Sequence, residues 1–254
     1  MRVLLTNDDG IHAPGLWALH QVFSTRHQVT VVAPDRERSA VGHGITLHQP
    51  LRFENARVNG SLSGFAVNGT PADCVKLGLA ELLDPPPELV VSGINPGANV
   101  GINLNYSGTV AAAKEAAMAG IPAMAVSIIA PGDRHVDAAA RFAESLSMQV
   151  KERGLPRGTF LNVNFPDLPM TEIRGVRWSR QGTGTFAQHF EKRRDPRDRI
   201  YYWQGCDGQE DYDQSDIDGA ALGDRYVSIT PIKCDMTDYD TLRELSRWNI
   251  SVPH

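Results

Sequence analysis

The sequence Arg2-Val3-Leu4-Leu5-Thr6-Asn7-Asp8-Asp9-Gly10 places a short, continuous apolar run directly before two adjacent aspartates. Such a run is typical of a β-strand that is covered on both faces. Similar runs recur at residues 29–33, 89–91 and 123–129, and helix-like segments lie between them. Strands that alternate with helices pair in parallel through right-handed crossovers. The sequence therefore predicts an α/β fold with a doubly wound, mainly parallel sheet.

The helical segments are recognised by their spacing and by their ends. Residues 16–23 carry apolar side chains at helical spacing. Residues 71–83 follow Thr70, a hydroxyl cap, with proline at the first helical position and Asp73 three residues past the cap. Residues 110–118 are rich in alanine. We expect these three segments to be the crossover helices that cover the sheet.

One segment interrupts the alternation of strands and helices. Residues 47–67 contain Gly60 and Gly64, which we interpret as the turn residues of an inserted hairpin. Beyond residue 130 the pattern is looser. There we expect an amphipathic helix over 137–150 and strands at 160–165 and 226–232.

The C-terminal third contains a long polar stretch. Residues 191–224 are dense in Arg, Asp, Gly and Tyr and have few aliphatic side chains, so they predict a solvated excursion. The alternative is an arm that packs on a partner or rims a site, because aromatic residues in a polar segment are typical of interface anchors. Those aromatic residues are Tyr201, Tyr202, Trp203 and Tyr212. A closing helix is expected to carry Leu242, Leu245 and Trp248 on one face.

Composition and charge exclude several classes of protein. The chain has 254 residues, with 25 basic and 30 acidic side chains and a formal net charge of −5, so duplex nucleic acid is not an expected partner. The three cysteines, Cys74, Cys206 and Cys234, form no C-x-x-C pair, which favours a reducing compartment. The apolar run at the start is too short for a signal peptide, and charged residues, glycine and proline interrupt the most apolar stretch, 111–130. We expect a cytoplasmic protein with no membrane partner.

The adjacent carboxylates Asp8 and Asp9 predict a metal site. In open α/β sheets, ligands bind beyond the carboxyl ends of the strands, and two ionised carboxylates confined there would repel each other unless a cation lay between them. Ser39 and Asn95 lie in the loops after the second and third strands and can add two more oxygens. An all-oxygen site suits Mg²⁺ or Mn²⁺ and not zinc or copper. The alternative is that Asp8 and Asp9 only cap a helix or form an Asp-Gly turn.

A second signal lies where the alanine-rich helix begins. Ser107, Gly108 and Thr109 open this helix, and free N–H groups and the helix dipole make such a start an anion site. The alternative is that Ser107 or Thr109 is only a helix cap. No G-x-G-x-x-G follows the first strand, and no G-x-x-x-x-G-K-[ST] occurs in the chain. A carboxylate metal site beside a phosphate cradle points to metal-assisted hydrolysis of a phosphate ester.

Several motifs together resemble the survival protein E (SurE) family of metal-dependent 5′-nucleotidases. The specific signature is Asn7-Asp8-Asp9-Gly10 followed, in this order, by Ser92-Gly93-Ile94-Asn95 and Tyr106-Ser107-Gly108-Thr109. The matching stretches, which span nearly the whole chain, are residues 5–10, 32–36, 68–75, 91–95, 106–113 and 226–232.

The resemblance implies roles for particular residues. The metal ligands would be Asp8, Asp9, Ser39 and Asn95, which would hold one divalent cation per subunit, with Asp8 and Asp9 as the catalytic carboxylates. Ser107, Gly108 and Thr109 would bind the phosphate, with Asn7 beside it. His12 and His43 are interpreted as loop residues and Cys74 as a core residue.

The resemblance also implies an architecture and a reaction. The chain would be one domain over 1–254, with a Rossmann-like core and the metal site in 1–130. Residues 131–254 would complete the core and form a C-terminal extension that subunits exchange in a homodimer or homotetramer. The substrates would be nucleoside 5′-monophosphates, also 3′-monophosphates and short polyphosphate, hydrolysed by a metal-activated water.

Two other functions stay open. The first is a phosphatase that forms a phosphoaspartate, although such enzymes space their acids as D-x-D and Asp8 and Asp9 are contiguous. The second is a non-catalytic sensor that binds a metal and a nucleotide without turnover.

Overall fold

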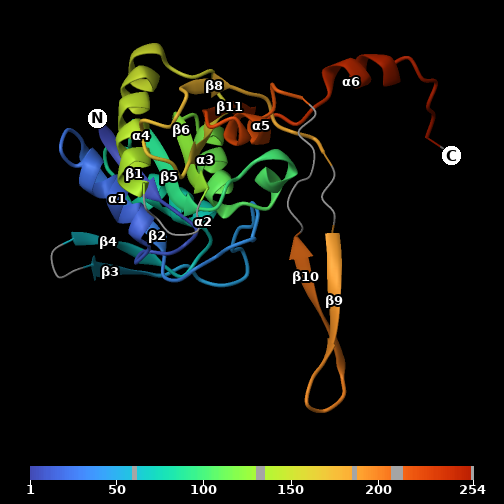
Figure 1. The fold of residues 1–254 in the computed structure, drawn as a ribbon, viewed down its shortest axis with the longest axis horizontal. Coiled ribbons are helices and arrows are strands. Elements are labelled where there is room, and N and C mark those ends of the chain that lie inside the picture. The colour runs from blue at the N-terminus through green and yellow to red at the C-terminus, as the bar shows by residue number, and fades with distance from the viewer. Residues whose placement is uncertain (59–61, 130–134, 185–187, 207–213, 253–254) are drawn as a thin grey trace.

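The computed structural model describes residues 1–58, 62–129, 135–184, 188–206 and 214–252. Nine strands of this part of the chain form one sheet (Figure 1). In the order in which they lie side by side, they are β3 (Phe53–Val58), β4 (Leu62–Val67), β2 (Gln28–Pro34), β1 (Arg2–Thr6), β5 (Leu89–Pro96), β6 (Ala123–Ile129), β7 (Thr159–Pro166), β11 (Val227–Lys233) and β8 (Val176–Trp178).

The strands from β4 to β7 all pair in parallel, which confirms the doubly wound α/β fold. The two edges of the sheet are mixed, because β3 is antiparallel to β4 and β11 is antiparallel to β7. The expected hairpin over 47–67 is therefore present as β3 and β4, and its second strand also extends the main sheet along β2. The interpretation of Gly64 as a turn residue was wrong, because Gly64 lies inside β4 against Val31; Gly60 lies outside the described residues.

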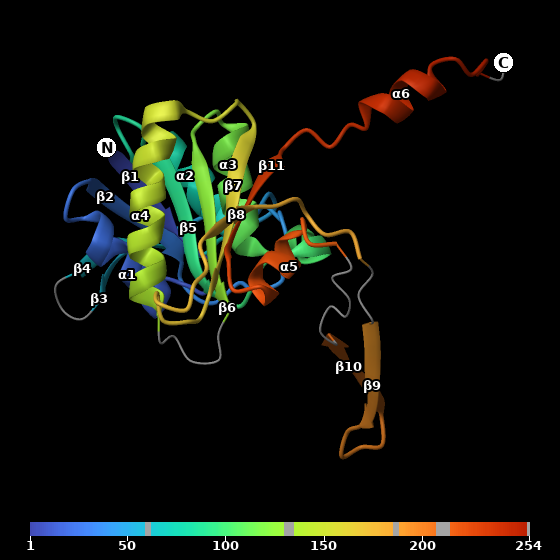
Figure 2. The ribbon, with the colours of Figure 1, turned by 45° about the horizontal axis from the view of Figure 1, so that its top comes forward.

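Helices cover both faces of the sheet (Figure 2). On one face α1 (Pro14–Phe23) packs beside α4 (Val136–Arg153), and on the other α2 (Pro71–Leu77) packs beside α3 (Gly108–Met118). Alternate residues of β1 supply both cores: Val3 and Leu5 face α1 and α4, whereas Leu4 faces α2 and α3. The continuous apolar run in β1 thus follows from burial on both sides.

The helix ends agree with their sequence signals. Thr70 and Asp73 form the predicted capping box of α2, since each side chain accepts a hydrogen bond from the backbone amide of the other residue. The α-helix ends at Leu77 and continues as a π-helical turn over Gly78–Leu82. Ser107 caps α3, and its hydroxyl accepts a hydrogen bond from the amide of Val110 at 3.2 Å.

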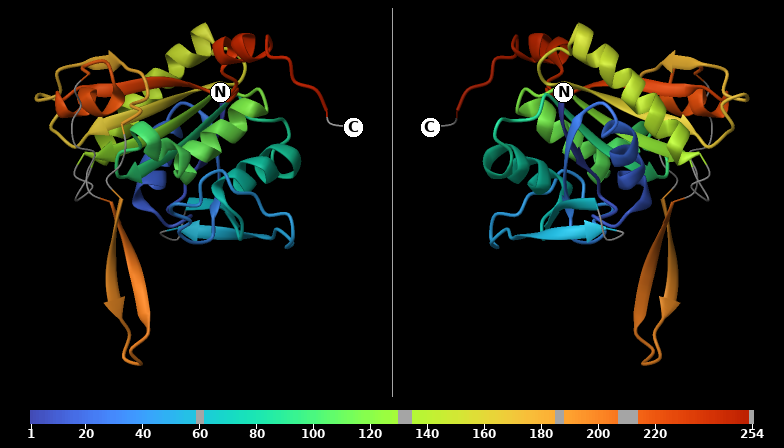
Figure 3. Two further views of the ribbon diagram at one scale, coloured as in Figure 1. Left: turned by 90° about the vertical axis from the view of Figure 1, so that its right-hand side faces the viewer. Right: turned by 90° about the vertical axis from the view of Figure 1, so that its left-hand side faces the viewer.

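Two C-terminal elements stand away from the body (Figures 1 and 2), and Figure 3 shows the hairpin among them extending from it. They are the hairpin of β9 (Gln188–Arg194) with β10 (Ile200–Cys206), and α6 (Tyr239–Leu245). The polar stretch over 191–224 therefore contains regular secondary structure. The expectation that it adds little to the core was wrong for α5 (Asp218–Gly223), because Ala221 and Leu222 of this helix are buried. The closing helix was expected to carry Leu242, Leu245 and Trp248 on one face. That expectation was wrong for Trp248, because α6 ends at Leu245. Among the described residues, no helix combines the length and the apolar character that a membrane span requires.

The contact between α1 and β5 gives a test of this packing. An added Cβ at Gly15, in the first turn of α1, would lie 2.2 Å from the carbonyl oxygen of Ile94. Alanine improves helix propensity by about 1 kcal/mol, but overpacking costs about 1–3 kcal/mol, so we expect Gly15→Ala to destabilise the fold. The measurement is the melting temperature. Gly223→Ala is the control, because no atom lies within 4 Å of its added Cβ. Equal melting temperatures for the two variants would contradict the packing.

Candidate active site

The loops that follow β1 and β2 lie against each other at the carboxyl edge of the sheet. The amide of Arg38 donates a hydrogen bond to the carbonyl oxygen of Asp8 at 2.7 Å. Gly10 has a φ of 98°, and an added Cβ there would lie 2.9 Å from the backbone carbon of Arg36, so this contact requires glycine. The Asp-Asp-Gly turn thus packs directly onto the segment that leads to Ser39.

Asp8 also lies against the start of α3, a hundred residues later in the chain. The Thr109 hydroxyl donates a short hydrogen bond to Oδ1 of Asp8. An added Cβ on Gly108 would lie 2.7 Å from the Cβ of Asp8, so glycine allows the helix start to approach this closely. Asp8 is buried, with only 4% of its surface exposed. The structure therefore brings Asp8, Gly108 and Thr109 into one contact.

Burial determines the electrostatics of Asp8. Removal from water raises its pKa above the ordinary value of 3.8, and hydrogen bonds from the Thr109 hydroxyl and from the Gly108 and Thr109 amides oppose this shift. Among the described residues, no Lys, Arg or His side chain forms an ion pair with Asp8. In the described part of the chain, the donors that stabilise the negative charge of Asp8 are thus neutral.

The neighbours of Asp8 in the chain supply further oxygen atoms. Asn7 is fully buried, and its amide nitrogen donates to the carbonyl oxygen of Gly10 at 3.0 Å. The side-chain oxygen of Asn7 is buried and receives no hydrogen bond from the described residues. Asp9 follows and is half-buried. A buried acceptor without a donor is costly, so Asn7 is suited to contact a ligand.

Ser39 lies on the loop after β2, as the sequence predicted, but the expectation of a loop at Asn95 was wrong, because β5 continues to Pro96 and Asn95 pairs with Ser127 of β6. Ser39 is exposed and its hydroxyl donates to Oε1 of Glu37 at 2.7 Å. Asn95 is half-buried, and its amide nitrogen donates to the carbonyl oxygen of Gly97 at 2.7 Å. Within the described chain, neither side chain is hydrogen-bonded to Asp8. The structure therefore places both residues at the expected edge without joining them to the aspartate.

A cavity of about 140 Å³ opens beside Ser107, between α3 and the strands β7 and β11. Its walls include the basic side chains of Lys114 and Lys233. The protein has a net charge of −5, yet this approach to the helix start is locally basic. An anionic ligand at the start of α3 would meet favourable charge on this side.

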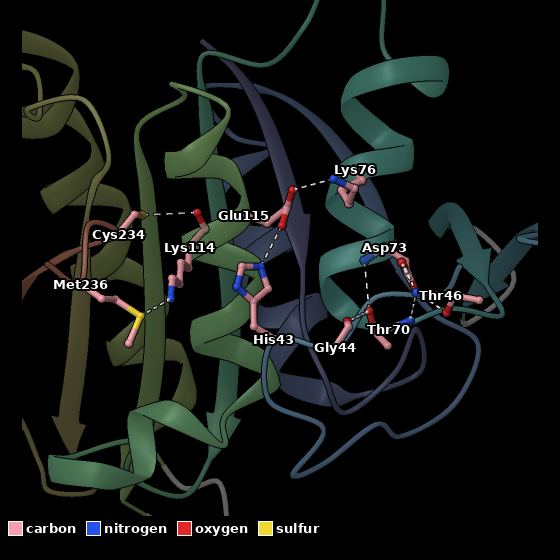
Figure 4. A network of polar contacts seen from close by, with 10 residues as sticks. All are labelled: His43, Gly44, Thr46, Thr70, Asp73, Lys76, Lys114, Glu115, Cys234 and Met236. Carbon is pink, nitrogen blue, oxygen red and sulfur yellow. Dashed lines mark hydrogen bonds and ion pairs between the residues drawn. The ribbon is translucent and has the colours of Figure 1, made fainter. Parts of the chain in front are cut away.

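Two acidic residues near the site have roles that the sequence did not reveal. Asp73 was predicted only as a helix cap, and it also binds Thr46 in the loop that carries Ser39 (Figure 4). Glu115 is buried in the alanine-rich helix and contacts His43 and Lys76. The only signal in the sequence was a single acid among alanines. Cys74 is fully buried, as expected.

Comparisons with known proteins agree with this arrangement. The family described as survival protein SurE matches residues 3–188. A 5′-nucleotidase SurE from Desulfatibacillum aliphaticivorans is 57% identical over 254 residues, which covers 100% of both chains. A 5′-nucleotidase SurE from Syntrophobacter fumaroxidans is 48% identical over 250 residues, 98% of this chain and 100% of the relative.

The fold has a close counterpart among solved structures. The crystal structure of the SurE protein from Aquifex aeolicus superimposes with a TM-score of 0.85 at 36% identity. The match covers 97% of this chain and 98% of that one. Sequence, fold and the order of the loops at the carboxyl edge therefore lead to one conclusion: the chain belongs to the survival protein SurE family.

Proposed function

We propose that the protein is a metal-dependent phosphomonoesterase that hydrolyses nucleoside 5′-monophosphates to nucleoside and inorganic phosphate. The observation that carries the proposal is the contact between the buried Asp8 and the start of α3 at Gly108 and Thr109. It joins a carboxylate suited to a cation with a helix N-terminus suited to a phosphate. The relatives named 5′-nucleotidase SurE support the same substrate class. Nucleoside 3′-monophosphates and short polyphosphate are proposed as further substrates.

The residues at this edge fit a hard divalent cation. Burying an ionised carboxylate costs several kcal/mol unless an opposite charge compensates it, and Asp8 has no basic partner in the described chain. The donors available are oxygens, which suit Mg²⁺ or Mn²⁺. Asp8, Asp9, Ser39 and Asn95 would hold one cation per subunit. Bound there, the cation would lower the pKa of a water molecule and offset charge on the phosphate.

The chain's own groups would bind and orient the phosphate. The amides from Ser107 to Thr109 and the dipole of α3 favour negative charge at the helix start, where the equatorial oxygens carry it during an in-line attack. The Thr109 hydroxyl holds Asp8 in one orientation, so this carboxylate needs no rearrangement during the reaction. Asn7 offers its unpaired amide oxygen within the same loop. Asp8 and Asp9 are the carboxylates we assign to catalysis.

A second copy of the chain is the partner we propose for the C-terminal elements. No residue of α6 is buried, and Leu242, Leu245 and Trp248 are 53%, 40% and 62% exposed. The β9–β10 hairpin also exposes aromatic side chains, Tyr201, Tyr202 and Trp203; Tyr212 lies outside the described residues. Apolar area of this kind is stabilised when another subunit covers it. We propose a homodimer or homotetramer with exchanged C-terminal elements.

A cytoplasmic location is also proposed. Cys74 and Cys234 are free thiols in the described chain, as a reducing compartment would leave them.

The metal requirement gives the first test. Exhaustive chelation is expected to lower phosphate release from a nucleoside 5′-monophosphate by about 100-fold or more, because cation catalysis supplies several kcal/mol. Addition of Mg²⁺ or Mn²⁺ should restore it. The measurement is inorganic phosphate released across a panel of nucleotides with each metal. Full activity after chelation would exclude the mechanism, and tight nucleotide binding without phosphate release would identify a sensor.

Substitution of Asp8 separates function from stability. Because burial raises the pKa of Asp8 in the folded protein above 3.8, protonated Asp8 contributes to the stability of the metal-free fold. This stability is fully present below pH 3.8 and is lost as the pH rises through the pKa of the folded state. At neutral pH Asp8→Asn should therefore raise the melting temperature of the metal-free protein while it abolishes Mn²⁺ binding. Ser39→Ala, which removes a neutral ligand, should weaken Mn²⁺ binding by only about tenfold. An Asp8→Asn protein that binds Mn²⁺ like the parent would show that Asp8 is not a ligand.

Removal of the C-terminal arm tests the oligomer. Truncation before Thr237 deletes α6, which buries no residue in its own chain, so the melting temperature of the core should change little. The mass measured by light scattering should fall, because the exchanged contact is lost. An unchanged mass with a lower melting temperature would instead show that α6 stabilises its own subunit.

A further inference from the structure

The loop that joins β2 to β3 carries Ser39 and has little regular structure. It crosses the start of α2 and of α3, and Figure 4 shows its side chains His43 and Thr46 directed toward these two helices. A loop of this length has many conformations in water unless specific contacts hold it. Several of the contacts that hold this loop are made by two buried acids that the proposed chemistry does not use.

The first contact joins the loop to α2 through Asp73. The two carboxylate oxygens of Asp73 accept from Thr46, Oδ1 from the amide at 3.0 Å and Oδ2 from the hydroxyl at 2.6 Å. Oδ2 also accepts from the amide of Thr70 at 2.9 Å, which is the helix cap. The Thr70 hydroxyl donates to the carbonyl oxygen of Gly44 at 2.8 Å. Asp73 is only 2% exposed, so these bonds are made away from water.

The second contact joins the loop to α3 through Glu115. Nε2 of His43 lies 2.8 Å from Oε2 of Glu115, and Nζ of Lys76 donates to Oε1 at 3.1 Å (Figure 4). These two partners lower the pKa of Glu115, so the acid remains ionised although it is buried. The amide of Gly42 donates to the carbonyl oxygen of Tyr106, one residue before the phosphate-binding turn, at 2.9 Å.

Ser39 lies between these anchors and the aspartate turn. On one side the Arg38 amide is bonded to Asp8, and on the other the chain is held from Gly42 onward. Between them Ala40 has a φ of 55°, a left-handed conformation that an alanine adopts only when its surroundings impose it. Ser39 itself is exposed, and among the described residues its hydroxyl donates to Glu37 of the same loop. The position of its hydroxyl therefore depends on the ends of the segment.

We propose that Asp73 and Glu115 are positioning residues, which hold the loop over 35–52 so that Ser39 can join the cation at Asp8. The proposal rests on the proposed function, because it concerns the same metal site. Neither acid touches the phosphate or the cation. Each acts through the loop, and Thr46 and His43 transmit the effect.

The test uses substitutions that nearly preserve the shape of each side chain. Thr46→Val keeps the shape of the side chain and removes the hydroxyl, whereas Thr46→Ser keeps the hydroxyl. Glu115→Gln removes the charge that holds His43 and Lys76. Glu152→Gln is the matched control, because Glu152 is an exposed acid near the end of α4 on the opposite face of the sheet. The readouts on the full-length chain are the affinity for Mn²⁺ alone, from the electron paramagnetic resonance signal of the free ion, then kcat, KM and the melting temperature.

We expect Thr46→Val and Glu115→Gln to weaken Mn²⁺ binding by about tenfold, the lower end of the loss seen for groups that orient metal ligands. At limiting Mn²⁺, kcat/KM of these two variants should fall together with their affinity for Mn²⁺. Saturating Mn²⁺ should recover most of kcat. Thr46→Ser and Glu152→Gln should behave like the parent. If Thr46→Val and Glu115→Gln bind Mn²⁺ like the parent but melt earlier, the two acids are only structural and the proposal is wrong. If the unsubstituted protein binds no Mn²⁺, the proposed function fails, and the positioning role fails with it.

Discussion

The burial of Asp8 against the start of α3 is the constraint on which the rest of the site depends. A carboxylate that is 4% exposed has lost most of its hydration, and neutral donors return only about 1.5–3 kcal/mol each. The Thr109 hydroxyl and two backbone amides supply such donors. The contact also requires Gly108, because any larger residue would displace the aspartate. The geometry thus stabilises a charge that is still incompletely compensated, which is the condition under which a carboxylate binds a cation.

The topology of the sheet explains why these groups meet at all. The carboxyl ends of β2, β1, β5 and β6 point to one edge, so the loops that follow them are adjacent although they are far apart in sequence. The close backbone contact at Gly10 then sets how tightly the first two loops approach, and the contact at Gly15 sets how closely α1 approaches β5. The cores on the two faces of the sheet hold the strands rigidly, which places the polar residues on a fixed frame. A rigid frame matters because a site loosened by about 1 Å loses most of its effect.

Within the described part of the chain, the β9–β10 hairpin and α6 are not stabilised by the core that holds the site. A two-stranded hairpin is marginally stable in water by itself, and α6 is too short to be stable as an isolated helix. Ion pairs within the hairpin, such as Arg194 with Asp198, are exposed and contribute little. These elements are therefore expected to be stable where a second subunit covers them, whereas the site at Asp8 is built from residues 7–109 and lies in the body of the fold.

The sequence alone determined the parallel α/β core, because burial on both faces of a strand leaves a continuous apolar run, as in β1 and β6. It also determined the capping box at Thr70, because cap chemistry is local, whereas the roles of the candidate site residues stay predictions. Gly64, Trp248 and α5 were misread, since a glycine inside a strand, a helix end and a short buried helix depend on distant neighbours. Only the tertiary structure decided that Asp73 and Glu115 hold the loop of Ser39. Their partners lie 27 and 72 residues away, and no local pattern records a hydrogen bond made over that separation.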